Sequence, residues 1–164
     1  MDKPRLIKGG VDVDDRGIVT FCNDFDMSEI KRFYMLENHE QGYVRAWHGH
    51  IKEAKWVVCV SGVAVVGVAE MVGSSKTRCP DPDAYGKWID VGVERFALHE
   101  PESFTLHPNG DILYIPPGYA NGHKNLVTGT RVLHFSSMTM EEAGEDDYRF
   151  DSSIHGWVWE VKSR

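Results

Sequence analysis

The chain has 164 residues, of which 41% are apolar and 26% are charged, and its formal net charge is −7. The length suits a single domain over residues 1–164 with a sizeable core. The negative charge disfavours a nucleic-acid partner, because phosphate backbones are negative as well. The most apolar stretch, residues 57–72, is interrupted by Ser61, Gly62 and Gly67 and is shorter than the roughly 20 residues of a membrane helix. We therefore expect neither a nucleic-acid nor a membrane partner.

The cysteines indicate a reducing compartment. Cys22, Cys59 and Cys79 are odd in number, lie far apart and form no zinc-binding pattern. The first ten residues, "MDKPRLIKGG", contain no apolar segment of the kind found in signal peptides. Both features predict a cytoplasmic protein.

Short segments of strand length follow one another along the chain. They are rich in β-branched and aromatic residues, and Gly, Pro or Asp turns separate them. The predicted strands are residues 17–22, 30–36, 43–50, 55–60, 63–70, 96–100, 103–107, 111–116 and 130–136, with turns at 14–17, 61–62, 81–83, 108–110 and 116–118. Residues 139–150 form the only predicted helix. Many short strands at near-regular spacing predict a sandwich or barrel.

Two histidines lie one residue apart in the predicted strand 43–50. Side chains two apart on a strand face the same side, so His48 and His50 are expected to point together into the barrel. Gly42, His48, His50, Lys55 and Gly62 are separated by five, one, four and six residues. Such a pair is a candidate metal site or a candidate acid–base pair.

A second spaced motif follows, with Gly110, Pro116, Gly118, Asn121 and Asn125 separated by five, one, two and three residues. Together the two spacings resemble the two cupin motifs. Metal-binding cupins carry two histidines and a glutamate in the first motif and one histidine in the second.

Lys55 stands at the glutamate position and Asn121 at the last histidine position. A protonated lysine has no lone pair to give and repels a cation. We therefore expect no metal and no other cofactor.

The chain also resembles the dTDP-4-dehydrorhamnose 3,5-epimerase family of cupins. The similar segments occur in the same order over most of the length: "DDRG", "VRAWHGH", "KWVVCVSG", "DPDAYGKW", "IPPGYANGHKNL" and "EDDYRFDSSIHGWVW". The resemblance implies an all-β cupin jelly-roll barrel with little helix, and a homodimer. It implies metal-independent 3- or 3,5-epimerisation of a nucleotide-diphosphate 4-keto-6-deoxy sugar through an enolate. Such sugars belong to cell-surface polysaccharides, including lipopolysaccharide.

The resemblance also implies residue roles. His48 corresponds to the base that removes the proton beside the ketone, and Lys55 to the lysine near the keto oxygen. Arg16 and Arg45 correspond to arginines that contact the ligand. An arginine suits a diphosphate because its planar fork donates parallel hydrogen bonds.

Three positions depart from the epimerase pattern. Asn121 replaces the second family histidine and is retained as a substrate contact. His134 stands where a family tyrosine returns a proton to the far face of the sugar, and we expect it to deliver that proton. The family aspartate that pairs with the base has no counterpart before Arg164. Tyr119, beside the Pro-Pro-Gly turn, is a further candidate substrate contact.

Other functions remain open. The nucleotide-sugar 3,4-ketoisomerases carry an R-G-x-H-x-H-K pattern, which "VRAWHGH" and the upstream "IKRFYMLE" resemble, and this makes His50 a second proton-transfer residue. A barrel that binds a sugar nucleotide without turnover is an alternative, because His48 lacks its expected aspartate. A metal-dependent cupin, such as a small-molecule oxygenase, would instead use His48 and His50 as ligands.

Overall fold

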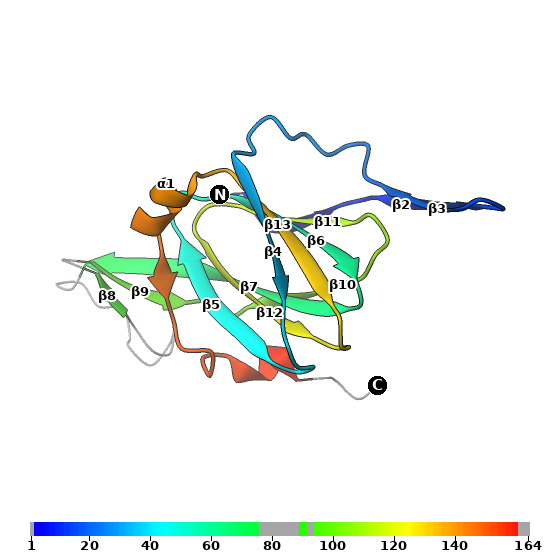
Figure 1. Cartoon of the computed structure of the whole chain (residues 1–164). Coiled ribbons are helices and arrows are strands. Elements are labelled where there is room, and N and C mark those ends of the chain that lie inside the picture. The colour runs from blue at the N-terminus through cyan, green and yellow to red at the C-terminus, as the bar shows by residue number, and fades with distance from the viewer. Residues whose placement is uncertain (1, 76–88, 92–93, 161–164) are drawn as a thin grey trace.

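The computed structural model describes residues 2–75, 89–91 and 94–160 (Figure 1). Strands dominate it, with one short α-helix, α1, and one 3₁₀ turn, η1. The elements are β1 (Arg5–Ile7), β2 (Gly10–Asp14), β3 (Gly17–Phe21), β4 (Arg32–Glu37), β5 (Val44–His50), β6 (Lys55–Ser61), β7 (Ala64–Ser75), β8 (Ile89–Val91), β9 (Glu94–Leu98), β10 (Glu102–Leu106), β11 (Ile112–Ile115), β12 (Tyr119–Asn125), β13 (Arg131–Ser136), α1 (Met140–Glu145), β14 (Tyr148–Arg149) and η1 (Gly156–Trp159).

Two antiparallel sheets form the barrel. One has five strands in the order β1-β11-β6-β13-β4, and the other has seven, with the order β14-β5-β12-β7-β9-β8 and β10 paired to β7. The hairpin β2–β3 forms a separate two-stranded sheet. The prediction of an all-β fold with little helix is confirmed. No helix in the described part of the chain is long and apolar enough to cross a membrane.

Most predicted strands are found, with ends shifted by a few residues. β1, β2, β8, β12 and β14 were not predicted as strands. β2 and β12 have the polar sequences "GVDVD" and "YANGHKN", and the others have only two or three residues. The predicted helix is shorter than expected: Thr139 and Glu142 form its capping box, and Asp146 ends it. The predicted turn at 81–83 lies outside the described residues, as do Cys79 and the "DPDAYGKW" segment.

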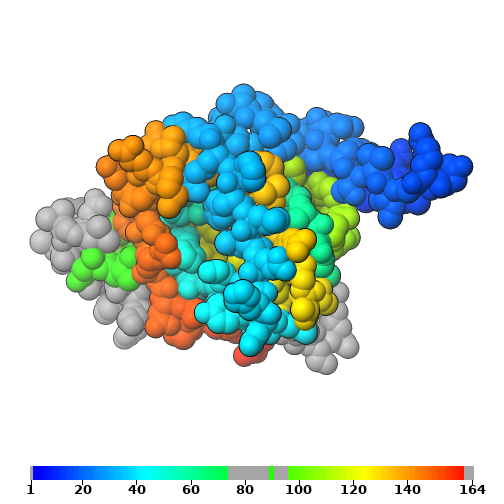
Figure 2. All heavy atoms as spheres, viewed as in Figure 1, coloured from blue at the N-terminus to red at the C-terminus, as the bar shows by residue number. Residues whose placement is uncertain are grey.

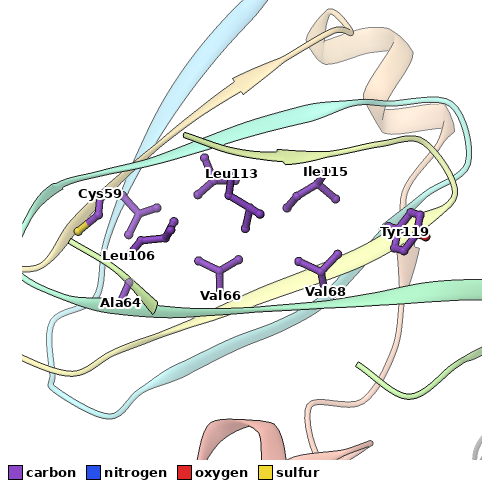
Figure 3. Close-up of a cluster of buried hydrophobic side chains, with 10 residues drawn as sticks. Cys59, Ala64, Val66, Val68, Leu106, Leu113, Ile115 and Tyr119 are labelled. Atoms are coloured by element: carbon purple, nitrogen blue, oxygen red, sulfur yellow. The ribbon is translucent and has the colours of Figure 1, made fainter. Parts of the chain in front are cut away.

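Apolar side chains fill one part of the space between the sheets (Figure 3). Val66 and Val68 from β7 point toward Leu113 and Ile115 from β11, and all four are buried. A second apolar cluster surrounds Trp47, whose indole Nε1 donates a hydrogen bond of 2.9 Å to the carbonyl of Ile154. A cavity lies in a different part of the barrel, which these clusters do not fill, between β4, β5, β12 and β13.

The β2–β3 hairpin extends away from the barrel as an arm (Figures 1 and 2). Its strands pair only with each other, from Gly10–Phe21 to Asp14–Gly17. Val13, Ile18 and Val19 are 69%, 69% and 63% exposed. An arm with this much exposed apolar surface is typical of a segment that packs against another chain.

Candidate active site

A cavity of about 470 Å³ lies between the two sheets, beside α1. This volume is in the range of small-molecule sites. Polar side chains from five strands line it. They are Arg32 and Tyr34 on β4, His48 and His50 on β5, Lys55 on β6, Asn121 and His123 on β12, and His134 on β13. The barrel therefore brings several titratable groups into one enclosed space, which is typical of catalytic sites.

A β-bulge decides which side chains of β5 face the cavity. Asn121 on β12 pairs with His48, whereas His123 pairs with Arg45, so β5 carries one extra residue between these pairs. The extra residue places Arg45, His48 and His50 on the cavity wall, although simple alternation would separate Arg45 from the histidines. Gly122 permits the close approach, because a Cβ there would lie 2.4 Å from the Cβ of Ala46.

His50 is held in a defined orientation by Asp146. Its Nδ1 lies 2.7 Å from the backbone carbonyl of Asp146. Because a carbonyl only accepts, Nδ1 carries the proton of the neutral ring and Nε2 is left with a free lone pair. The Asp146 carboxylate also accepts hydrogen bonds from the backbone N–H groups of Ile51, Lys52 and Glu53, at 3.0, 2.8 and 3.0 Å. One residue at the end of α1 therefore fixes both His50 and the turn that follows β5.

Glu53 is a buried carboxylate that does not line the cavity but contacts three residues that do. Its side chain is 0% exposed and lies 3.1 Å from His50 Nδ1, 3.3 Å from Lys55 Nζ and 2.9 Å from the guanidinium of Arg32. Ser136 Oγ donates a further hydrogen bond to it. The carboxylate therefore balances the charges of Lys55 and Arg32 where water is excluded. Among the described residues, no three His, Cys, Asp or Glu side chains are arranged to hold a metal ion.

Burial keeps the histidines of the cavity neutral. Desolvation, assisted by Arg149 and Lys55, lowers the pKa of His48 to about 4. Desolvation and the nearby Lys55 also lower the pKa of His50. Burial lowers the pKa of Lys55 as well, although Glu53 opposes the shift. At neutral pH the two imidazoles are therefore unprotonated and able to accept a proton.

Arginines gather at the exposed edge of the cavity. Arg45 is exposed and makes no ion pair with any described residue. Arg149 on β14 is paired with Asp147, with its Nε 2.7 Å from Oδ1. Both arginines line the cavity, and the planar guanidinium group suits hydrogen bonds to phosphate oxygens.

Most of the residues predicted from the sequence line this cavity: His48, His50, Lys55, His134, Arg45 and Asn121. Asn121 also donates a hydrogen bond of 3.1 Å from Nδ2 to the His48 carbonyl. That His134 delivers a proton stays a prediction.

Two predicted substrate contacts do not line the cavity of this chain. Arg16 lies at the tip of the β2–β3 arm, where its exposed guanidinium pairs with Asp14. Tyr119 packs in the apolar cluster of the barrel (Figure 3), and its ring is 8% exposed. Within one chain, neither residue is placed to contact a ligand in the cavity.

Several residues of the site were not predicted from the sequence. Arg32 and Tyr34 could have been found, because alternation along β4 places them with Leu36 on one face. Glu53 gave no periodic signal, since it lies in the turn between β5 and β6. Asp146 and Arg149 are about one hundred residues away in sequence from the histidines that they approach.

The comparisons with known proteins agree with this architecture. The family model described as "FdtA: WxcM-like, C-terminal" matches residues 5–97, which is more than half of the chain. No curated protein matches the chain in sequence.

Several solved structures are similar in fold. The 3,4-ketoisomerase QdtA from Thermoanaerobacterium thermosaccharolyticum, in complex with TDP, has a TM-score of 0.60 at 20% identity, over 96% of this chain and 92% of that chain. The Mycobacterium tuberculosis rmlC epimerase has a TM-score of 0.65 at 16% identity, over 96% and 73%. The 3'-monoepimerase ChmJ from Streptomyces bikiniensis, in complex with dTDP-quinovose, has a TM-score of 0.66 at 14% identity, over 96% and 73%. The predicted cupin fold and the resemblance to both enzyme families are confirmed.

Proposed function

The chain belongs to the FdtA family, and from this premise we propose that it is a nucleotide-sugar 3,4-ketoisomerase. It would move the keto group of a nucleotide-diphosphate 4-keto-6-deoxy sugar from C4 to C3 without a metal. The observation that carries the proposal is that His48 and His50 line one cavity from the same strand. An isomerase of this kind needs two proton-transfer groups, one for carbon and one for oxygen.

The reaction balances without a co-reactant. His48 removes the proton from C3, which gives an enolate with its charge on the C4 oxygen. The C3 hydroxyl then passes its proton through Nε2 of His50 to the C4 oxygen, and the protonated His48 returns a proton to C4, so the ketone ends at C3. We assign the carbon proton to His48, and the transfer between the oxygens to His50, whose Nε2 is free because Nδ1 is held by Asp146.

The remaining side chains would stabilise charge. Lys55 can donate a hydrogen bond to the enolate oxygen in a site from which water is excluded, where such a bond is strong. Arg45 and Arg149 would contact the diphosphate at the exposed edge of the cavity. A bound diphosphate would also raise the pKa of His48 above about 4, because a nearby anion favours the protonated ring.

A 3- or 3,5-epimerase is the second candidate. Two observations favour it: the two epimerase structures have TM-scores of 0.65 and 0.66, and Lys55 stands at the position of the epimerase lysine. Both candidates share proton removal by His48 beside the ketone. They differ in whether the ketone moves and in what His50 does.

One experiment distinguishes these functions. The protein is added to dTDP-4-keto-6-deoxyglucose in deuterated water and followed by proton NMR. A ketoisomerase incorporates deuterium and gives a 3-keto product, whereas an epimerase incorporates deuterium at C3 or C5 and keeps the ketone at C4. Binding without exchange would identify a non-catalytic sugar-nucleotide-binding cupin, and no binding would contradict the proposal.

We also propose that the protein acts in the cytoplasm as a homodimer of one-domain chains, spanning residues 1–164. Cys22 and Cys59 are free thiols, which fits a reducing compartment. The exposed apolar arm β2–β3 would pack on a second chain and carry Arg16 to the partner's cavity. This arrangement would restore the predicted ligand contact of Arg16.

A further inference from the structure

Two histidines occupy the most buried part of the cavity. His123 on β12 and His134 on β13 are each 2% exposed, and their ring centroids are 6.2 Å apart. Tyr34 on β4 stacks on His134, with a centroid distance of 4.9 Å and an angle of 9° between the rings. The proposed chemistry of His48 and His50 does not use this group, although all of these residues line the same cavity.

These imidazoles lack hydrogen-bond partners in the described part of the chain. Both nitrogens of His134 and Nε2 of His123 are fully buried and unpaired. Each such group lowers the stability of the fold, because it has given up water without a replacement. In the sheets, His134 lies between Val57 and Tyr34, and His123 lies between Val66 and Arg45, so none of the four strand neighbours pairs with these nitrogens. An unpaired polar cluster in such a place indicates a group that binds there.

The charge state limits the kind of group. Burial lowers the pKa of His123 to about 4 and holds the pKa of His134 well below its usual value. Both rings are therefore neutral at pH 7, and each offers one N–H donor and one lone pair. A hydroxyl group both donates and accepts, so it can pair with such rings. A methyl group would leave the nitrogens unpaired.

We infer that His123 and His134 form a hydroxyl-binding subsite, which selects a nucleotide sugar with a hydroxyl group on the carbon that enters the deepest part of the barrel. The inference rests on the proposed function, because it assumes that a sugar nucleotide occupies the cavity. His134 then acts as a specificity residue, and Tyr34 keeps its ring in position by stacking.

Calorimetric titration of the whole protein tests the subsite. The ligands are dTDP, dTDP-glucose and three analogues of dTDP-glucose that each lack one hydroxyl, at C2, C3 or C4; C6 is left out because the proposed substrate is a 6-deoxy sugar. We expect one analogue to bind wild type about 2- to 12-fold more weakly than dTDP-glucose, which is the loss of one hydrogen bond. In His134→Phe that difference disappears, whereas the exposed control His107→Phe retains it. Binding of all analogues with equal affinity would overturn the subsite but leave the proposed function intact.

A melting experiment without ligand provides an independent result. His134→Phe keeps an aromatic ring against Tyr34 and removes two unpaired nitrogens, so its Tm should rise. A lower Tm would show that the imidazole is needed for the fold and would overturn the inference. If wild type binds neither dTDP nor any sugar nucleotide, the proposed function fails, and the inference fails with it. Discrimination that persists in His134→Phe would show that another residue binds the hydroxyl group, and it would overturn the subsite.

Discussion

The carboxylate of Glu53 lies 3.3 Å from the ammonium group of Lys55, and both side chains are almost completely buried. Arg32 and His50 approach the same carboxylate at 2.9 and 3.1 Å. The carboxylate therefore neutralises and orients groups of the site that come from three different strands. Its importance leads to the first prediction.

Glu53→Gln should destabilise the protein by about 3–5 kcal/mol, because Lys55 and Arg32 would remain in the barrel without their counter-ion. Urea unfolding at pH 7 measures this change. The matched control is Glu37→Gln, which removes the exposed pair with Arg131 and should cost about 1 kcal/mol or less. Equal losses in the two variants would show that Glu53 does not hold the site together.

Substitution of His48 and substitution of His50 should impair different steps of the reaction. His48→Asn should reduce deuterium incorporation about 10²–10⁴-fold, because the base that removes the carbon proton is lost. His50→Asn should still exchange the C3 proton but should form little 3-keto product, because the oxygen-to-oxygen transfer is blocked. Proton NMR in deuterated water reports both events in one sample, and His107→Asn is the exposed control. If both variants lose exchange equally, the separate roles are wrong.

Whether a residue of this site can be predicted from the sequence depends on whether strand periodicity or long-range contacts bring it to the cavity. His48, His50 and Lys55 could be predicted because strand alternation places the two histidines together and cupin spacing adds Lys55 from the other sheet. Arg45 reaches that wall only through a bulge, which depends on Gly122 of another strand. The barrel itself was predictable from many short apolar segments separated by turns.

The residues that hold the histidines could not be predicted in this way. Glu53 acts from a turn, which has no periodic pattern. Asp146 is brought to His50 by the path of the chain after β13, and that path depends on contacts between distant residues. The two predictions that do not line the cavity, Arg16 and Tyr119, came from family resemblance and from a position beside a turn.

Asp146→Ala should lower both stability and activity. It removes a carboxylate that accepts backbone hydrogen bonds at Ile51, Lys52 and Glu53, so we expect a loss of about 2–4 kcal/mol. Alanine keeps the backbone carbonyl that binds His50, but without the carboxylate the end of α1 is no longer tied to the turn after β5, so His50 loses its fixed position. Turnover should therefore fall more than ligand affinity, because the arginines at the cavity edge stay in place. Asp26→Ala removes an exposed carboxylate that accepts bonds from Ser28, and it should have little effect on either property. A variant that melts early but retains full turnover would contradict the positioning role.

Stability should fall as the pH decreases from 7 to 5. The folded-state pKa of His123 is about 4, below the usual 6.5, so the unfolded chain binds a proton in this range that the folded chain does not. The contribution is fully present above pH 6.5 and is lost toward pH 4. It amounts to about 3 kcal/mol for this residue over that range, of which about 2 kcal/mol is lost by pH 5. Urea unfolding at pH 7 and pH 5 measures the slope, which His123→Leu should reduce and the exposed control His107→Leu should not. Equal slopes in all three proteins would contradict burial of a neutral His123.

The last prediction concerns the β2–β3 arm. Ile18 is 69% exposed at the arm, so Ile18→Glu should shift a homodimer toward monomers in sedimentation experiments. The control Val127→Glu changes a residue of a loop that is 41% exposed, and it should leave the dimer intact. Monomeric wild-type protein would contradict the proposed assembly.

Mixing two inactive variants then tests whether Arg16 acts on the partner's cavity. Arg16→Ala lacks the proposed diphosphate contact, and His48→Asn lacks the base. In a mixed dimer, one cavity would combine an intact His48 with the intact Arg16 of the partner subunit. Random exchange of subunits should therefore restore about a quarter of the wild-type activity. If Arg16 served its own chain, no cavity in the mixture would have both residues, and activity would not rise above that of the separate variants.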